Sequence, residues 1–299
     1  MRRRLFAIIA TLLLLAPGLP ATGQSRVPGV GMVVSTPELA IRACPRRNCD
    51  IVTSVRLGQT LKITGPAENG FLPVHHYTGE GWAYGLFVAG DQQGVPVLEG
   101  GVTGCDRVAI IFNVGIGEPL AWSVLDVLAA TDAPATMFVQ EWWTDYYPAW
   151  VAGMREDGYV VGGHGGKLQR ATDPTPLELS TDVADTAAAI TAATSAPPDA
   201  VFTPYRLDVD PPVYAAIAFA GYLPVQWTLS ARDYEADATI DSVTARVLDN
   251  AADGAIIEFT LDSANSGTVT AAALAEIIPA LRDAGYTLVT VPEIALPCA

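Results

Sequence analysis

The spacing of hydrophobic and polar positions divides the chain into two regions. From residue 107 onward, short apolar runs alternate with longer stretches rich in alanine and leucine. Such alternation is typical of parallel strands covered by helices, so we predict an α/β domain of barrel-like form over residues 105–299. The stretches with helical character are 120–130, 148–157, 177–194, 212–220, 242–252 and 269–284.

Before this region, the apolar runs are shorter and are separated by glycine, proline and asparagine. Several short strands at such spacing predict a small all-β barrel, which we assign to residues 31–90. Residues 91–104 contain several glycines and one proline and are predicted to be a linker. The expected strands are 39–42, 50–58, 59–64, 70–74 and 81–84.

The N-terminus has the pattern of a secretory signal peptide. Three arginines, Arg2 to Arg4, precede an apolar run over residues 5–16, and Ala21 and Gly23 are small residues at the cleavage positions. The apolar run is shorter than the roughly 20 residues that a membrane span needs. We therefore expect a signal peptide over residues 1–23, no transmembrane anchor after its cleavage, and a secreted or cell-surface protein.

Charge and cysteine content agree with that compartment. The formal net charge is −15, and becomes −18 without the three arginines (−15 − 3). Such a chain repels nucleic acid, so we expect no nucleic-acid partner. Four cysteines in an exported protein indicate two disulfides, for which composition alone allows three pairings. Cys44 and Cys49 enclose a short turn, and Cys105 and Cys298 bracket the α/β domain, so we predict these two pairs.

Several motifs in the second domain resemble a known family. Residues 110–115 read Ile-Ile-Phe-Asn-Val-Gly, residues 158–164 end in Gly-Gly-His, and residues 284–290 read Ala-Gly-Tyr-Thr-Leu-Val-Thr. Together they resemble the NodB-homology family of polysaccharide deacetylases, whose first motif reads T-F-D-D-G. The resemblance covers nearly all of the domain and implies an irregular (β/α) barrel. In the first domain, residues 39–42, 58–63 and 81–83 resemble a bacterial SH3 domain.

The resemblance implies a metal-dependent hydrolysis whose first components are missing here. The family's general base falls on Asn113, and its metal-binding aspartate falls on Val114. An amide has no useful basicity near neutral pH, and valine has no lone pair to offer. Of the family's two metal-binding histidines, His164 is present and the second is Leu168. One imidazole without the other two ligands does not make a zinc site, so we expect no metal and no other cofactor.

The groups that assist this chemistry are replaced as well. The arginine that orients the base aligns with Phe202, the aspartate that orients the catalytic histidine aligns with Ser230, and the general acid aligns with Thr260. Base and acid are therefore lost together with their orienting partners. No catalytic residue of the family is intact, and the resemblance implies a pseudoenzyme.

Other residues near these positions suggest binding. Glu258 lies two residues before Thr260 on a predicted strand, so both face the same way, and a buried carboxylate would need a partner such as Asn113 or His164. A Glu258–His164 pair would be a new acid–base site, whereas a satisfied structural network is the simpler interpretation. A glycan groove is the remaining hypothesis, because aromatic rings stack on sugars. Its predicted residues are His164, Tyr205, Trp227, Tyr234 and Glu258.

Three functions are compatible with the sequence. The first is a secreted, non-catalytic protein that binds cell-wall peptidoglycan or another polysaccharide. The second is an active or residual metal-dependent carbohydrate N-deacetylase, the one case that would require zinc or another divalent metal. The third is a structural envelope protein that binds a partner and uses the barrel as a scaffold. Fold alone does not decide between them.

Overall fold

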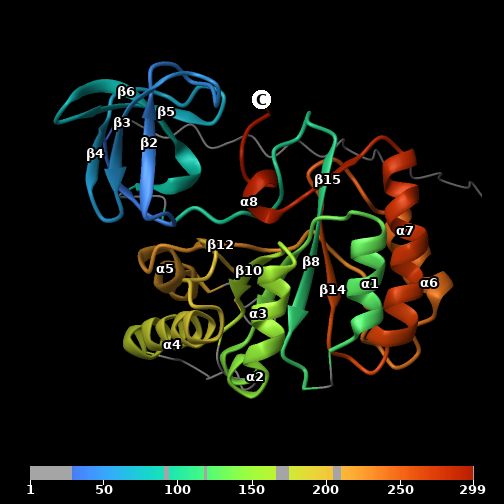
Figure 1. Cartoon of the computed structure of the whole chain (residues 1–299). Helices are drawn as coiled ribbons and strands as arrows, with labels where there is room; N and C mark the ends of the chain where they lie inside the picture. Colours follow the sequence, from blue (N-terminus) through green and yellow to red (C-terminus); the bar gives the residue numbers. More distant parts are fainter. Residues whose placement is uncertain (1–28, 91–93, 118–119, 166–174, 205–209, 299) are drawn as a thin grey trace, which may run out of the picture.

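The computed structural model describes residues 29–90, 94–117, 120–165, 175–204 and 210–298, which form two domains (Figure 1). The predicted signal peptide, Leu168 and Tyr205 lie outside the described residues. Within the described ranges, every helix is too short or too polar to cross a membrane.

The first domain is an antiparallel sheet of seven strands, as expected for a small all-β domain. Alternate positions of β4 are buried and exposed, so Leu61 and Ile63 enter the core while their neighbours face solvent. All five predicted runs are strands. The strands are β1 (Gly29–Val33), β2 (Glu38–Arg42), β3 (Ile51–Arg56), β4 (Thr60–Ile63), β5 (Phe71–His76), β6 (Gly79–Tyr84) and β7 (Val88–Gly90), in the order β3-β2-β6-β5-β4-β1-β7.

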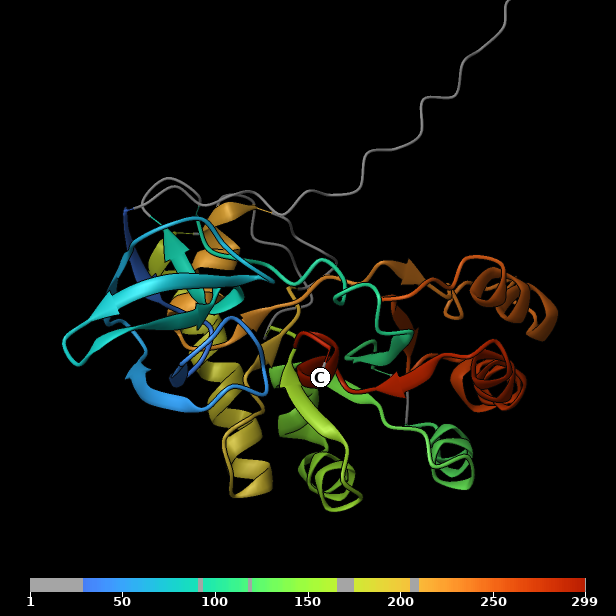
Figure 2. The same ribbon diagram turned by 90° about the horizontal axis from the view of Figure 1, so that it is seen from above.

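The second domain is built on a curved parallel sheet, which confirms the predicted α/β barrel architecture (Figure 2). Its first strand, β8, pairs with two strands on the same side: residues 107–109 pair with β15, and residues 111–114 pair with β9. The strands are β8 (Arg107–Val114), β9 (Thr136–Val139), β10 (Val160–Gly163), β11 (Val201–Phe202), β12 (Leu223–Pro224), β13 (Leu229–Ser230), β14 (Ile256–Thr260) and β15 (Thr287–Val289). Their order is β12-β11-β10-β9-β8-β14-β13, with β15 on β8.

Most of the helices pack on the outer face of this sheet. Three helices begin with capping boxes, in which Thr175, Thr239 and Thr290 exchange hydrogen bonds with the residue three positions on. All six predicted helices are present, and two short ones were not predicted, α2 and α8. The helices are α1 (Trp122–Ala130), α2 (Glu141–Tyr146), α3 (Pro148–Glu156), α4 (Pro176–Thr194), α5 (Pro211–Phe219), α6 (Ile240–Leu248), α7 (Ala271–Asp283) and α8 (Val291–Ile294).

Alternation along the strands separates two apolar layers. Phe112 and Val114 of β8 belong to the cluster that packs against the helices. Ala109 and Ile111 face the other way, into the barrel interior, where Ile256 of β14 joins them. Because successive side chains point to opposite faces, Asn113 continues the interior side of β8. The interior is therefore apolar where the strands begin and polar where they end.

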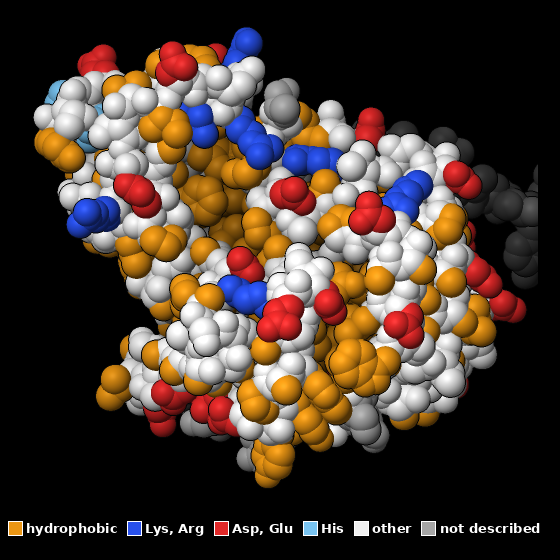
Figure 3. Space-filling view, in the orientation of Figure 1, with side chains coloured by type: hydrophobic (Ala, Val, Ile, Leu, Met, Phe, Trp, Pro, Cys, Tyr) orange, Lys and Arg blue, Asp and Glu red, His pale blue; other side chains and the backbone are white. Residues whose placement is uncertain are grey.

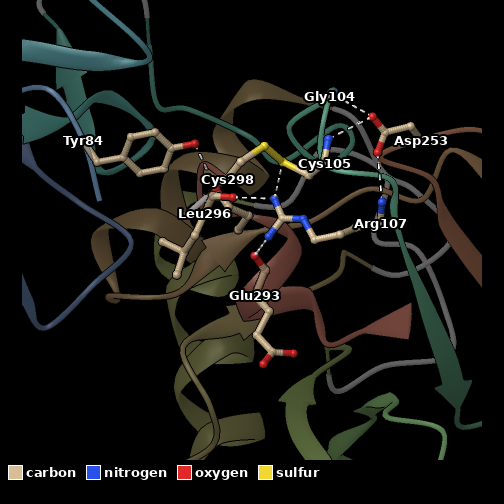
Figure 4. Close-up of a disulfide and its surroundings, with 9 residues drawn as sticks. Tyr84, Gly104, Cys105, Arg107, Asp253, Glu293, Leu296 and Cys298 are labelled. Atoms are coloured by element: carbon tan, nitrogen blue, oxygen red, sulfur yellow. Dashed lines mark hydrogen bonds between the residues drawn. A yellow bond between two sulfur atoms is a disulfide. The ribbon is translucent and has the colours of Figure 1, made fainter. Parts of the chain in front are cut away.

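Both predicted disulfides are present. Cys44 and Cys49 close the turn between β2 and β3, with 5.7 Å between their Cα atoms. Cys105 and Cys298 have their Cα atoms 5.6 Å apart and join the residues just before β8 to the C-terminal tail after α8 (Figure 4). The Arg107 guanidinium donates hydrogen bonds to the carbonyls of Glu293 and Leu296 beside this bridge.

The described part of the predicted linker lies against the second domain. Leu98 is buried and pairs with Val225 next to β12, and the Gly101 N–H donates to the carbonyl of Gly254. The two domains also touch directly: the Tyr84 hydroxyl donates to the Ala295 carbonyl at 3.0 Å. Residues 94–104 thus connect the domains as a packed segment and not as a free spacer.

Candidate functional site

A pocket of about 720 Å³ opens where the parallel strands of the second domain end. This is the end at which open α/β sheets and barrels place their ligands. It brings together eight of the sequence-predicted residues and adds four that the sequence did not indicate, Gly115, Ile116, Gln140 and Arg232. The lining residues are Asn113, Val114, Gly115, Ile116, Gln140, His164, Trp227, Ser230, Arg232, Tyr234, Glu258 and Thr260.

Glu258 is the central polar group of the pocket. Its side chain is 4 % exposed, and it faces the interior from β14 together with Thr260, as predicted. One carboxylate oxygen accepts a hydrogen bond from the Ser230 hydroxyl at 2.5 Å, and the other accepts from the Asn113 amide at 3.3 Å. The strand register explains the contacts, because Ser230 lies opposite Glu258 and Asn113 lies opposite Thr260. Asn113 was expected as a partner, whereas Ser230 was not.

Burial dominates the acidity of this carboxyl group. Desolvation raises the pKa of Glu258 to about 7, the hydrogen bonds from Ser230 and Asn113 oppose the rise, and the charge of Asp233 adds to it. Near neutral pH the group is therefore divided between its charged and neutral forms. In the neutral form, the carboxyl group gains a proton that it can donate.

His164 is held in a buried, neutral state. It follows β10 and is 4 % exposed, and its Nδ1 atom lies 2.6 Å from the hydroxyl of Thr203. Burial lowers the pKa of His164 to about 4, so the imidazole carries no charge at neutral pH. Thr203 follows β11 directly, and sequence reasoning missed it because the family's third motif drew attention to Phe202.

Phe202 and Val114 turn away from the polar groups. Phe202 is 2 % exposed and packs with Val183 and Ile217 of the covering helices, so it offers nothing to orient a base. The Val114 side chain is fully buried in the cluster between β8 and the helices. Both positions serve the apolar core.

Two further buried carboxylates hold the loops around the pocket. Asp262 accepts hydrogen bonds from the backbone N–H groups of Gly115, Ile116 and Gly117 at 2.8 to 3.1 Å, which fixes the turn after β8. Asp233 accepts from the Thr260 N–H and the Thr270 hydroxyl. Burial raises the pKa of each to about 6. Their hydrogen bonds cross between loops, and sequence reasoning assigned a role to neither of them.

The described residues do not fit the metal that the family's chemistry uses. Among them, no group of three or more His, Cys, Asp or Glu side chains is placed to bind a metal ion together. Val114, which we align with the family's metal-binding aspartate, is apolar, and the Nδ1 atom of His164 already contacts Thr203. The third position, Leu168, lies outside the described residues and has no ligating atom.

Comparison with known proteins identifies the class of the second domain. Residues 100–225 match the model of the polysaccharide deacetylase family. A peptidoglycan-N-acetylglucosamine deacetylase from Bacillus cereus is 29 % identical over 62 % of this chain and 87 % of its own length. A chitooligosaccharide deacetylase from Bradyrhizobium is 29 % identical over 65 % of this chain and 93 % of its own. Residues 100–225 are therefore similar to a polysaccharide deacetylase domain.

Solved structures agree on the fold. The crystal structure of a peptidoglycan N-acetylglucosamine deacetylase superposes with a TM-score of 0.62 at 21 % identity, over 67 % of this chain and 92 % of that one. An acetyl xylan esterase from Clostridium thermocellum gives 0.56 at 27 % identity, over 63 % and 89 %. A pseudoenzyme of the CE4 family from Bacillus anthracis gives 0.59 at 22 %, over 66 % and 67 %. The first and third of these identities support the fold alone.

Proposed function

We propose that this chain is a secreted glycan-binding protein whose deacetylase domain lacks the metal-dependent mechanism of its relatives. The observation that carries the proposal is the lining of the pocket. The family's base position is the amide of Asn113, and its acid position is the hydroxyl of Thr260. Neither an amide nor a threonine hydroxyl acts as a general acid or base near neutral pH. The pocket therefore keeps its shape without the family's acid–base chemistry.

The remaining pocket groups suit a neutral sugar. Trp227 and Tyr234 supply ring faces at the pocket, and Ser230, Asn113 and Glu258 converge there as hydrogen-bonding groups. Binding sites for small ligands combine apolar walls with a few fixed polar groups in this way. The relatives are named for peptidoglycan and chitooligosaccharide, so the cell wall is the ligand source that we propose. Two disulfides and the signal-like N-terminus support an extracytoplasmic location.

The direct test compares binding with turnover. The protein is mixed with a soluble N-acetylglucosamine tetramer, with and without added Zn²⁺, Co²⁺ or Mn²⁺, and both bound ligand and released acetate are measured. We expect saturable binding and no acetate above background. Trp227→Ala should weaken binding, whereas Tyr77→Ala, which removes an exposed ring from the first domain, should not. Metal-dependent acetate release that disappears in His164→Ala would overturn the proposal.

A second candidate, a residual hydrolase, draws support from one observation. Burial gives Glu258 a pKa of about 7, which is the range that a general acid or base needs near neutral pH, and its carboxylate contacts the Ser230 hydroxyl inside the pocket. This candidate predicts slow, metal-independent hydrolysis of acetylated oligomers. The activity would have to vanish in Glu258→Gln and persist in Thr203→Ser.

A further inference from the structure

A row of aromatic side chains extends along one side of the α/β domain. Neighbouring ring centroids are 6.2 Å apart for Trp142 and Tyr146, 6.3 Å for Tyr146 and Tyr147, 4.4 Å for Tyr147 and Trp150, and 6.3 Å for Trp150 and Trp122. Tyr147 and Trp150 are stacked, with 6° between their planes. We call these five residues the aromatic row. They come from α1, α2, α3 and the residue between α2 and α3.

The aromatic row begins at the pocket. Gln140, which lines the pocket, accepts a hydrogen bond from the Trp142 indole N–H at 2.5 Å. All five residues lie near the start of α1 or α3 or in α2, and these helices come after the carboxyl ends of β8 and β9 in the chain. They therefore share the end of the domain at which the pocket opens, where hydrophobic side chains also gather over α2 and α3 in Figure 3.

Two residues of the row are exposed, and the other three pack partly buried against the core. Tyr146 is 76 % exposed and Trp122 is 56 % exposed. Beneath them Trp143 is fully buried, with its ring 5.1 Å from Tyr147 and 5.8 Å from Trp150. Large exposed aromatic side chains that gather on one face of a protein mark a binding site. Because packing already restricts the partly buried rings of the row, a ligand would lose little free energy in ordering them.

The chemistry of the surroundings selects the ligand. Glu141 and Asp145 lie on α2 among the rings, and the whole chain carries a net charge of −15. Anionic lipids and other acidic partners are therefore repelled. Flat rings with polar edges, without a cationic neighbour on the helix, suit the apolar faces and hydroxyl groups of neutral sugars. Continuity with the pocket favours one ligand that occupies both places.

We infer that the aromatic row is an extension of the pocket that binds further sugar units, so that the ligand is a polysaccharide chain and not a single sugar. This inference rests on the proposed glycan-binding function. Under this inference the pocket makes the first contacts with the ligand, and the aromatic row adds affinity for longer chains. Substitutions in the row should therefore weaken the binding of long ligands alone.

The test measures affinity against ligand length by calorimetry, with the complete secreted protein and N-acetylglucosamine oligomers of two and six units. Trp122→Ala and Tyr146→Ala should each weaken hexamer binding about fivefold and leave dimer binding unchanged. Both side chains are exposed, so folding is preserved, and thermal melting verifies this. Tyr77→Ala is the matched control, because it removes a tyrosine that is 81 % exposed on the first domain.

The outcomes separate the inference from the function beneath it. Equal affinities for dimer and hexamer, with no effect of the row variants, would overturn the inference and leave the proposed function standing. An equal loss of dimer and hexamer binding in the row variants would overturn it too, since the row would then act through the pocket. Absence of binding by either oligomer would overturn both.

Discussion

The two ends of the barrel interior are made from the same strands and carry opposite chemistry. Where β8 and β14 begin, Ala109, Ile111 and Ile256 are sealed in an apolar cluster. Where these strands end, Asn113 and Glu258 face an open pocket. The comparison shows that packing and site chemistry are separated along the same strands. The closed end supplies the apolar packing, while at the open end the buried carboxylate of Glu258 accepts hydrogen bonds from Ser230 and Asn113.

Removal of the Cys105–Cys298 disulfide should cause the largest loss of stability, because this bridge joins two segments at the closed end that are 193 residues apart in the sequence. We expect the double variant Cys105→Ser, Cys298→Ser to lose about 4 kcal/mol of unfolding free energy. Denaturant unfolding under non-reducing conditions measures this. The short Cys44–Cys49 bridge, removed in the same way, is the control and should cost less. A smaller effect from the long bridge would contradict our account of the closed end.

The second-largest loss of stability is expected from a smaller side chain in the apolar cluster at the closed end. Ile111→Ala leaves a cavity among fully buried side chains and should lower the unfolding free energy by about 3 kcal/mol. Asn113→Ala, two residues on at the open end, should cost clearly less because its side chain borders the pocket. Comparable losses would show that the two ends do not differ as we describe.

Stability should fall as pH rises through neutrality. The folded-state pKa of Glu258 is about 7, above its ordinary value of 4.5, so the folded protein holds this proton more tightly than the unfolded chain. That contribution is complete below about pH 4.5 and is lost as pH rises toward 7 and beyond. Glu258 alone should account for roughly 2 to 3 kcal/mol of unfolding free energy between pH 5 and pH 8. Asp233 and Asp262, whose pKa values are also raised, act in the same direction.

Urea titrations at pH 5 and pH 8 check this expectation. Glu258→Gln should flatten the difference, since an amide does not titrate. If Glu258→Gln keeps the full pH dependence of the wild type, the effect comes from the other carboxyl groups.

The smallest effect concerns His164. Thr203→Val removes the hydroxyl that contacts its Nδ1 atom and should cost about 1 kcal/mol. Thr203→Ser keeps the hydroxyl and should behave like the wild type in this respect. Thermal melting of both variants provides the measurement, and equal destabilisation would mean that the methyl group matters more than the hydrogen bond.

The sequence by itself determined the element types and the residue types at the site. The six long helices and the five strands of the first domain follow from residue spacing, because burial of one face imposes a period. The sequence also places an amide, Asn113, and a hydroxyl, Thr260, at the positions that we align with the family's base and acid. In contrast, α2 and α8 are too short to show such a period, and β1 contains Gly29 and Gly31 and depends on its partners.

Only the tertiary structure decided which polar groups meet. Ser230 reaches Glu258 because β13 and β14 pair in one register, and Thr203 reaches His164 because β10 and β11 lie side by side. Successive residues of β11 point to opposite faces of the sheet. Phe202 therefore packs against the helices and not in the pocket, where the family motif would place an arginine. Contacts between strands that are distant in sequence depend on sheet order and register, which no local pattern encodes. The residue types at the pocket could thus be read along the chain, while the hydrogen bonds among them were set by strand pairing.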